Sequence, residues 1–171
     1  YNIATSGTNL FAVGNFQYIK SENRNYLMAI SKASGLITSW NPNANSTVES
    51  IELNGGNAYV GGYFTTVGGQ PRNYIAELSL TTGNASNWNP NANNVVKSTK
   101  LMGSSLYVGG YFTTIGGQNR NYLAALSNTT GLATAWNPKA DGPVNKVNPS
   151  NTDIVASGTF TFINSELRNN L

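Results

Sequence analysis

Residues 60–78 read VGGYFTTVGGQPRNYIAEL, and residues 108–126 read VGGYFTTIGGQNRNYLAAL, so one segment occurs twice in the chain. The two copies lie 48 residues apart, and Trp-Asn-Pro keeps the same step at residues 40–42, 88–90 and 136–138. Several markers that share one step without an insertion show that the chain is built from repeats. The repeats cover residues 1–48, 49–96, 97–144 and, in part, 145–171, and no second domain is expected.

Each repeat contains signals for four short strands. The expected strands of the second repeat are residues 48–53, 58–64, 74–79 and 85–88. Asn54-Gly55-Gly56 supplies a hairpin turn between the first two strands, because these residues tolerate a positive φ. A loop is expected at residues 65–73. The second strand is apolar or glycine on both faces, which indicates that both of its faces are covered.

Four antiparallel strands in about 48 residues match the size of one β-propeller blade. Such a sheet is stable only when neighbouring sheets stack on both of its faces. We therefore predict an all-β fold, a β-propeller segment of about 3.5 four-stranded antiparallel blades with a 48-residue repeat. A β-solenoid is the rival, but its coils are typically nearer 20–30 residues and lack hairpins. A crowded inner position in the second strand is expected for the glycines at one phase: Gly14, Gly62, Gly110 and Gly158.

The two quoted copies, each followed by a Thr-Gly turn and Trp-Asn-Pro, resemble the delta-60 repeat of bacterial β-propellers. Weaker copies at residues 12–30 and 156–171 lack the Gly-Gly pair, so identical loop geometry is not expected there. The resemblance implies a propeller within large secreted or cell-surface proteins, often beside adhesion or sorting modules. It implies no established reaction and no set of catalytic residues.

The segment Ala125 to Trp136 is similar to the tryptophan-docking motif of quinoprotein propellers, which locks neighbouring blades together. We interpret the Trp residues in the same structural sense. Tyr59 and Tyr63, with their counterparts one repeat away, are expected in the core between blades. The expected blade anchors are Trp40, Trp88, Trp136, Phe16, Phe64, Phe112 and Phe160, together with the four phase-matched glycines.

Arg-Asn pairs are the most distinctive polar feature of the repeats. A guanidinium is a planar fork of donors that suits carboxylates, phosphates, backbone carbonyls or sugar hydroxyls. The pairs recur at the same position of every repeat, which favours a structural role in which each Arg caps carbonyls of the loop before the third strand. The alternative is a ring of weak ligand sites. The candidate ligand or partner residues are Arg24, Arg72, Arg120, Arg168, Asn25, Asn73 and Asn121.

Composition argues against catalysis. Charged residues make up 10% of the chain, and His and Cys are absent, which excludes a Ser-His triad, thiolate chemistry and Cys or His metal ligation. The seven carboxylates form no pair marked out by position, so a hydrolase or lyase would need residues outside this segment. No catalytic residue, metal site or cofactor is expected. The net charge of +3 is spread along the chain, so nucleic-acid binding is not expected either.

These observations predict a non-catalytic propeller that acts as a secreted or cell-surface scaffold for protein interaction or adhesion. A glycan-binding propeller with one weak site per blade is the alternative. Three and a half open blades would expose apolar faces at both ends, so we expect the remainder of a longer propeller or another chain as partner. The absence of a stretch of roughly 18 apolar residues argues against membrane insertion.

Overall fold

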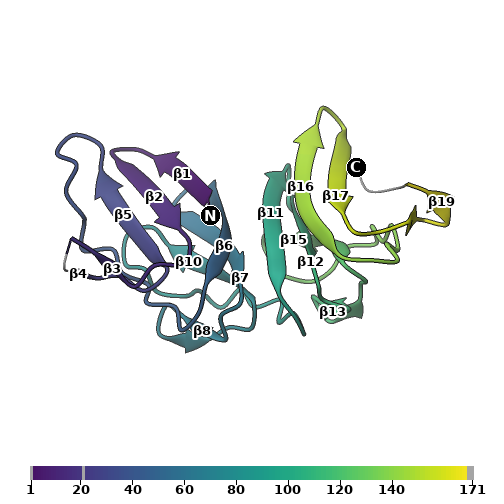
Figure 1. The fold of residues 1–171 in the computed structure, drawn as a ribbon, viewed down its shortest axis with the longest axis horizontal. Helices are drawn as coiled ribbons and strands as arrows, with labels where there is room; N and C mark the ends of the chain where they lie inside the picture. The colour runs from purple at the N-terminus through teal and green to yellow at the C-terminus, as the bar shows by residue number, and fades with distance from the viewer. Residues whose placement is uncertain (1, 21, 169–171) are drawn as a thin grey trace.

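The computed structural model describes residues 2–20 and 22–168, and these residues form strands, turns and connections without a helix (Figure 1). No helix long and apolar enough to cross a membrane is therefore found among them. The first sheet has the order β1-β2-β5, with bounds Asn2–Ser6, Asn9–Val13 and Leu27–Ser31. The second has the order β6-β7-β10, with bounds Val48–Asn54, Asn57–Gly62 and Ile75–Ser79.

The third and fourth sheets repeat this plan one step further along the chain. The third has the order β11-β12-β15, with bounds Val96–Met102, Ser105–Gly110 and Leu123–Ser127. In the fourth, β16 (Val144–Ser150) pairs antiparallel with β17 (Asp153–Gly158). The first strands of the last three sheets begin at Val48, Val96 and Val144, which are 48 residues apart.

The expected loop between the second and third strands is itself a small hairpin. In the second repeat it is formed by β8 (Thr66–Val67) and β9 (Gln70–Pro71), which pair antiparallel. Its turn residues Gly68 and Gly69 have φ values of 61° and 75°, which suits a tight hairpin turn. The other repeats form the corresponding hairpins from β3 (Tyr18–Ile19) and β4 (Glu22–Asn23), β13 (Thr114–Ile115) and β14 (Gln118–Asn119), and β18 (Phe162–Ile163) and β19 (Glu166–Leu167).

The hairpin persists in the last repeat, where the Gly-Gly pair is missing. Asn164 and Ser165 occupy its turn with φ values of 53° and 65°, so the hairpin forms in this copy without the Gly-Gly pair. The left-handed conformation costs free energy for a residue other than glycine. A short polar side chain lowers this cost because it can form a hydrogen bond to the nearby backbone. The hairpin pairing of the repeat therefore outweighs the preference of the individual turn residues.

The prediction of four full strands per blade is wrong in one detail. Each of the first three sheets contains three strands. The expected fourth strand of each sheet is reduced to one isolated bridge, such as that of Leu78 with Ala85. One residue after the bridge, the backbone oxygen of Ser86 accepts a hydrogen bond from the Arg72 guanidinium. The carbonyl that follows the bridge is thus bound to a side chain of the same blade.

The sheets are arranged around a common axis. Their first strands lie side by side, β6 between β1 and β11, and β11 between β6 and β16 (Figure 1). A hollow of about 330 Å³ is lined by side chains from all four of these strands. Its lining comprises Asn2, Glu49, Ser50, Lys97, Ser98, Lys100, Asn145, Lys146 and Asn148. Innermost first strands that surround one hollow, each followed by antiparallel hairpin partners, are the plan of a β-propeller, not of a solenoid.

Ion pairs join the first strands of two neighbouring blades. Lys97 Nζ lies 2.9 Å from Glu49 Oε1, and Lys100 Nζ lies 2.9 Å from Glu52 Oε2. In each pair the two residues occupy the same position of successive repeats. Glu49 and Lys97 also coincide with register shifts in their sheets, where a bulge re-aims a side chain. The second and third repeats thus carry opposite charges at these two positions, and the resulting ion pairs join the second blade to the third.

Candidate functional site

The candidate Arg residues bind backbone carbonyls within their own blades. Arg72 donates from Nη1 to Pro71 O at 2.7 Å and from Nη2 to Ser86 O at 2.5 Å. The guanidinium therefore ties the small hairpin to the segment that follows the third strand. A planar fork of donors suits two carbonyls held on different segments. Ligand binding would have to compete with these contacts.

Two other repeats show the same arrangement. Arg24 donates to Asn23 O and Thr38 O at 2.9 and 3.1 Å. Arg120 donates to Asn119 O and Thr134 O at 2.8 and 2.7 Å.

Arg168 differs from the other three. It is exposed, and within the described chain its guanidinium donates only to Leu167 O. Asn169, which follows it, lies outside the described residues.

Substitution of Arg72 by Ala is expected to lower the free energy of unfolding by roughly 2 kcal/mol, because two charge-assisted hydrogen bonds are lost and Ser86 O loses a partner. Arg72→Lys restores a charge but not the fork, so it should recover only part of the loss. Urea unfolding monitored by circular dichroism measures both variants. Arg168→Ala is the matched control, and an equal loss there would contradict the role of the two-carbonyl contact.

The candidate Asn residues lie beside these Arg residues on the surface. Asn73 Nδ2 donates to Asn91 Oδ1 at 2.9 Å, and Asn25 makes the same bond to Asn43 at 2.6 Å. Asn121 has Lys139 at the position that corresponds to Asn91, and its side chain makes no hydrogen bond within the described residues. The first two Asn residues therefore connect the start of the third strand to the Asn-Pro-Asn segment.

The Trp residues lie between blades. Trp40 is buried and donates from Nε1 to Ser79 O at 2.9 Å, across to the second sheet. Trp88 donates to Ser127 O at 3.0 Å, across to the third sheet. Each indole also meets an aromatic ring of its own blade edge to face, as in the pair of Tyr59 and Trp88 with ring centroids 5.0 Å apart. Through these contacts the indoles of Trp40 and Trp88 connect neighbouring sheets.

Other expected anchors differ in their exposure. Phe64, Phe112 and Phe160 are buried, whereas Phe16 and Trp136 are only half-buried. The expectation that Tyr63 belongs to the core is wrong, because 41% of its surface is exposed. Lys97 Nζ lies 5.4 Å from its ring centroid, so Tyr63 covers the ion pair of Lys97 instead.

Another recurring polar position was not identified from the sequence. Asn45 Oδ1 accepts hydrogen bonds from the backbone N–H groups of Thr65 and Thr66, and Asn93 repeats this in the next blade. Asp141 replaces the amide in the last repeat and accepts from Phe162 N and Thr161 N. The bond from Phe162, together with that from Thr161, holds the pKa of Asp141 below its ordinary value of 3.8.

A lowered pKa makes the contribution of Asp141 to stability dependent on pH. The contribution is present above the ordinary pKa and is lost as the pH falls through the folded-state value. Asp141→Asn keeps the accepting oxygen, as Asn45 and Asn93 do, and removes the titration. We expect the thermal midpoint of the parent chain to fall more steeply than that of the variant below about pH 4. Parallel slopes in thermal unfolding curves would contradict this assignment.

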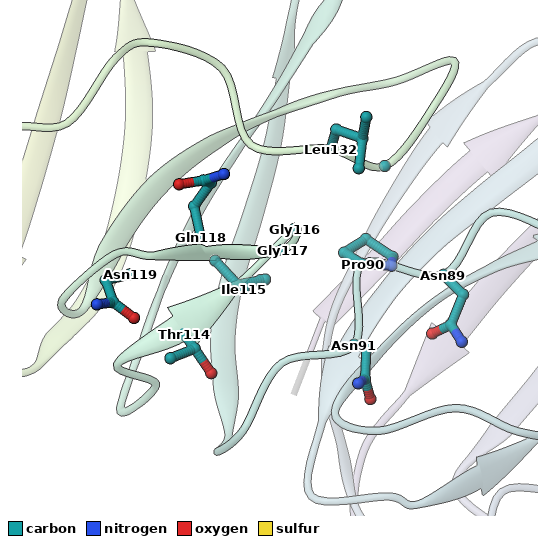
Figure 2. Close-up of a pocket in the computed structure, with 11 residues that line it drawn as sticks. Asn89, Pro90, Asn91, Thr114, Ile115, Gly116, Gly117, Gln118, Asn119 and Leu132 are labelled. Atoms are coloured by element: carbon teal, nitrogen blue, oxygen red, sulfur yellow. The ribbon is translucent and has the colours of Figure 1, made fainter.

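A polar groove recurs at one repeat step and is a candidate binding site. The larger copy, the Pro90 groove, has a volume of about 430 Å³ and lies between the Asn-Pro-Asn segment, the small hairpin and the Thr-Gly turn. It is lined by Asn89, Pro90, Asn91, Thr114, Ile115, Gly116, Gly117, Gln118, Asn119, Gly131 and Leu132. Figure 2 shows Gln118 and Asn119 on the hairpin side, with Pro90 and Asn91 facing them.

The smaller copy, the Pro42 groove, has a volume of about 290 Å³. Both grooves are fixed by backbone hydrogen bonds, from Gly68 N to Pro42 O at 2.7 Å and from Gly116 N to Pro90 O at 2.8 Å. A side chain at Gly68 or Gly116 would collide with the backbone of the next turn, so glycine is needed there.

The chemistry of the grooves is neutral and polar. Their linings contain amides, hydroxyls, backbone groups and a few apolar atoms, and neither lining includes a charged side chain. Such a surface fits an uncharged, hydroxyl-rich ligand better than an anion or a cation. The predicted Arg residues are not part of these linings. The recurrence of Asn-Pro-Asn and Gly-Gly-Gln is a sequence signal that could have identified this place.

The sequence profile of a family described as "domain of unknown function (DUF5122) beta-propeller" matches residues 56–85 and 105–126. The two matched segments are thus similar to this β-propeller family. The match includes the second and third strands and the small hairpin in the second repeat. The resemblance to a β-propeller repeat family and the all-β propeller fold are thereby confirmed. No curated protein matches the chain.

Solved structures support the same fold. The propeller chain is similar to the crystal structure of the computationally designed Ika4 protein, with a TM-score of 0.60, 10% identity, and coverage of 91% of this chain and 82% of that one. The computationally designed Ika8 protein gives a TM-score of 0.57 at 11% identity, with coverage of 94% and 43% respectively. At this identity the likeness concerns the fold alone.

Proposed function

We propose that this β-propeller segment is a non-catalytic interaction scaffold of a secreted or cell-surface bacterial protein, serving in protein interaction or adhesion. The observation that carries the proposal is the use of the recurring polar side chains. The guanidinium of Arg72 is bound to two backbone carbonyls, and the indole N–H of Trp88 is bound to a third. Groups held in this way maintain blade geometry and support an extended surface rather than a reaction centre.

Adhesion and location are tested separately. Beads coated with the folded chain should retain cells that display surface glycoproteins, and beads coated with heat-denatured chain should not. Labelling of intact producing cells with an antibody against the chain should give a signal comparable to that of lysed cells. Equal retention by both bead types would contradict the adhesive role. Labelling only after lysis would contradict the external location.

Glycan binding is the second candidate, and the repeated neutral groove is the observation that favours it. The Pro42 and Pro90 grooves have related linings one repeat apart, so one weak ligand unit can bind at each step. Several weak sites on one rigid scaffold gain affinity through multivalency. Neutral saccharides with repeated units match the uncharged linings and the recurrence of the grooves better than charged ligands do.

A glycan array probed with the chain tests this second candidate. Asn43 and Asn91 line the two grooves with φ values of 52° and 51°, so Gly can replace their amides without straining the backbone. The double variant Asn43→Gly/Asn91→Gly should lose array binding by about tenfold or more, while Arg168→Ala should retain it. Unchanged binding in the double variant, or no binding by the parent chain, would exclude the grooves as glycan sites.

A further inference from the structure

A hollow of about 380 Å³ lies in the third repeat, between the end of its small hairpin and the connection that follows its Trp-Asn-Pro motif. It is called the Lys139 hollow below. Unlike the Pro42 and Pro90 grooves, it is lined by charged side chains of both signs. All of its lining residues belong to the repeat of residues 97–144: Asn119, Asn121, Asn137, Lys139, Ala140 and Asp141.

The third repeat differs from the second in the contact across this place. In the second repeat, Asn73 Nδ2 donates to Asn91 Oδ1 at 2.9 Å, and this amide bridge joins the two segments. The first repeat has the same bridge. In the third repeat Lys139 takes the position of Asn91, and the side chain of Asn121 makes no hydrogen bond within the described residues. The amides that are bridged in two repeats therefore face a hollow in the third.

The backbone of Lys139 gives a second indication. Its φ is 52°, in the left-handed region, and Asn43 and Asn91 have φ values of 52° and 51° at the same position of their repeats. Asn reaches this conformation at a reduced cost because its short side chain can bond to the nearby backbone, which the side chain of Lys cannot do. Strained positions of this kind cluster at binding sites. A long cationic side chain thus stands where the backbone favours Asn.

The two charges of the hollow do not neutralise each other directly. Lys139 forms no ion pair with Asp141 or with another carboxylate of the described chain. Asp141 accepts the backbone N–H groups of Thr161 and Phe162 on Oδ1, and Oδ2 takes part in neither bond. The bonds from Phe162 and Thr161 hold the pKa of Asp141 below its ordinary value, so the carboxylate is charged at neutral pH.

We propose that the Lys139 hollow binds a free α-amino acid in its zwitterionic form. The ligand carboxylate pairs with Lys139, and the ligand ammonium donates to Asp141 Oδ2. The three Asn amides of the lining offer donors and acceptors to the remaining polar atoms. A simple anion would be repelled by Asp141 and a simple cation by Lys139, so the lining favours a ligand that carries both charges. This site is independent of adhesion and of the glycan grooves.

Glycine is the probe, because it is the smallest ligand of this class. Titration of glycine into the ¹⁵N-labelled full chain at pH 7 should shift the side-chain amide signals of Asn121 and Asn137 and should saturate below about 10 mM. Acetate and methylammonium each carry one of the two charges and should not saturate in this range. The side-chain amide of Gln118, in the Pro90 groove, should not respond.

Two substitutions that occur naturally in the second repeat test the two charges. Lys139→Asn introduces the residue found at Asn91 and should restore the bridge to Asn121. Asp141→Asn keeps an accepting oxygen for the hairpin, as Asn93 does, and removes the charge. Each should weaken glycine binding by about tenfold or more while the circular dichroism spectrum is unchanged. Asn91→Gly alters only the Pro90 groove and should bind glycine like the parent chain.

Three results would overturn the proposal. The first is a glycine shift that does not saturate, which would mean that the hollow is only a solvated surface. The second is saturation by acetate or methylammonium with the affinity of glycine, since one charge would then suffice. The third is parent-like glycine binding by Lys139→Asn or by Asp141→Asn.

Discussion

The Gly62→Ala chain is expected to lose about 3 kcal/mol or more of its free energy of unfolding. Gly62 ends β7 where the backbone of the preceding connection, at the start of β6, passes at close range. An added Cβ would collide with Thr47 O and lie 2.8 Å from Val48 Cα. Both atoms belong to the backbone at the start of β6, so relief would require a shift of a strand that also contacts the neighbouring blades.

Gly56→Ala is the matched control for this prediction. A Cβ at Gly56 would meet no atom within 4 Å, and its φ is not in the left-handed region. Its substitution should change the free energy of unfolding by less than about 1 kcal/mol. Urea unfolding followed by circular dichroism measures both variants. A similar loss in the two chains would show that general glycine flexibility, not close backbone approach, explains the repeated glycine.

The position of the glycines could be predicted from the sequence because the repeat itself reports a constraint shared by all blades. Gly62, Gly110 and Gly158 each approach the backbone of the preceding connection in the same way. The order of the strands was predictable for the same reason, since hairpin signals and apolar faces recur at every step. Shared features that leave a periodic or glycine signal are therefore visible in the pattern alone.

The small hairpin and the loss of the fourth strand could not be predicted in this way. Two-residue strands such as β8 and β9 have no periodicity, and their formation depends on the left-handed φ at two successive turn residues. The expected fourth strand forms only the bridge of Ala85, and the next carbonyl, that of Ser86, accepts a hydrogen bond from Arg72. A pattern of side chains does not reveal which acceptor a distant guanidinium takes.

The groove was likewise missed because its lining comes from three separated segments. Asn91, Gln118 and Leu132 are brought together only when the Asn-Pro-Asn segment packs against the next hairpin and turn (Figure 2). The Arg residues were predicted as candidates instead, because a guanidinium at the same position of each repeat is conspicuous in a chain of low charge. The structure places those cations in backbone contacts and the uncharged amides around the open space.

The Trp residues of the repeated Trp-Asn-Pro motif should contribute unequally to the free energy of unfolding, because their blades have different neighbours. Trp88→Ala is expected to cost about 3–5 kcal/mol, because it empties a buried site between two sheets and leaves Ser127 O without its donor. Trp136→Ala should cost about half as much or less. Its indole is half-buried, and its ring centroid lies 5.1 Å from that of Tyr107. On one side it lines a largely apolar hollow of about 360 Å³.

Chemical unfolding of both variants, followed by circular dichroism so that the lost fluorophore does not matter, tests this inequality. Trp88→Phe separates the two causes, since it keeps most of the packing and removes the indole N–H. Equal costs for Trp88→Ala and Trp136→Ala would mean that the ring stacking within each blade dominates. An unequal result would mean that each blade draws much of its stability from the neighbour that follows it, as a stacked array of incomplete sheets requires.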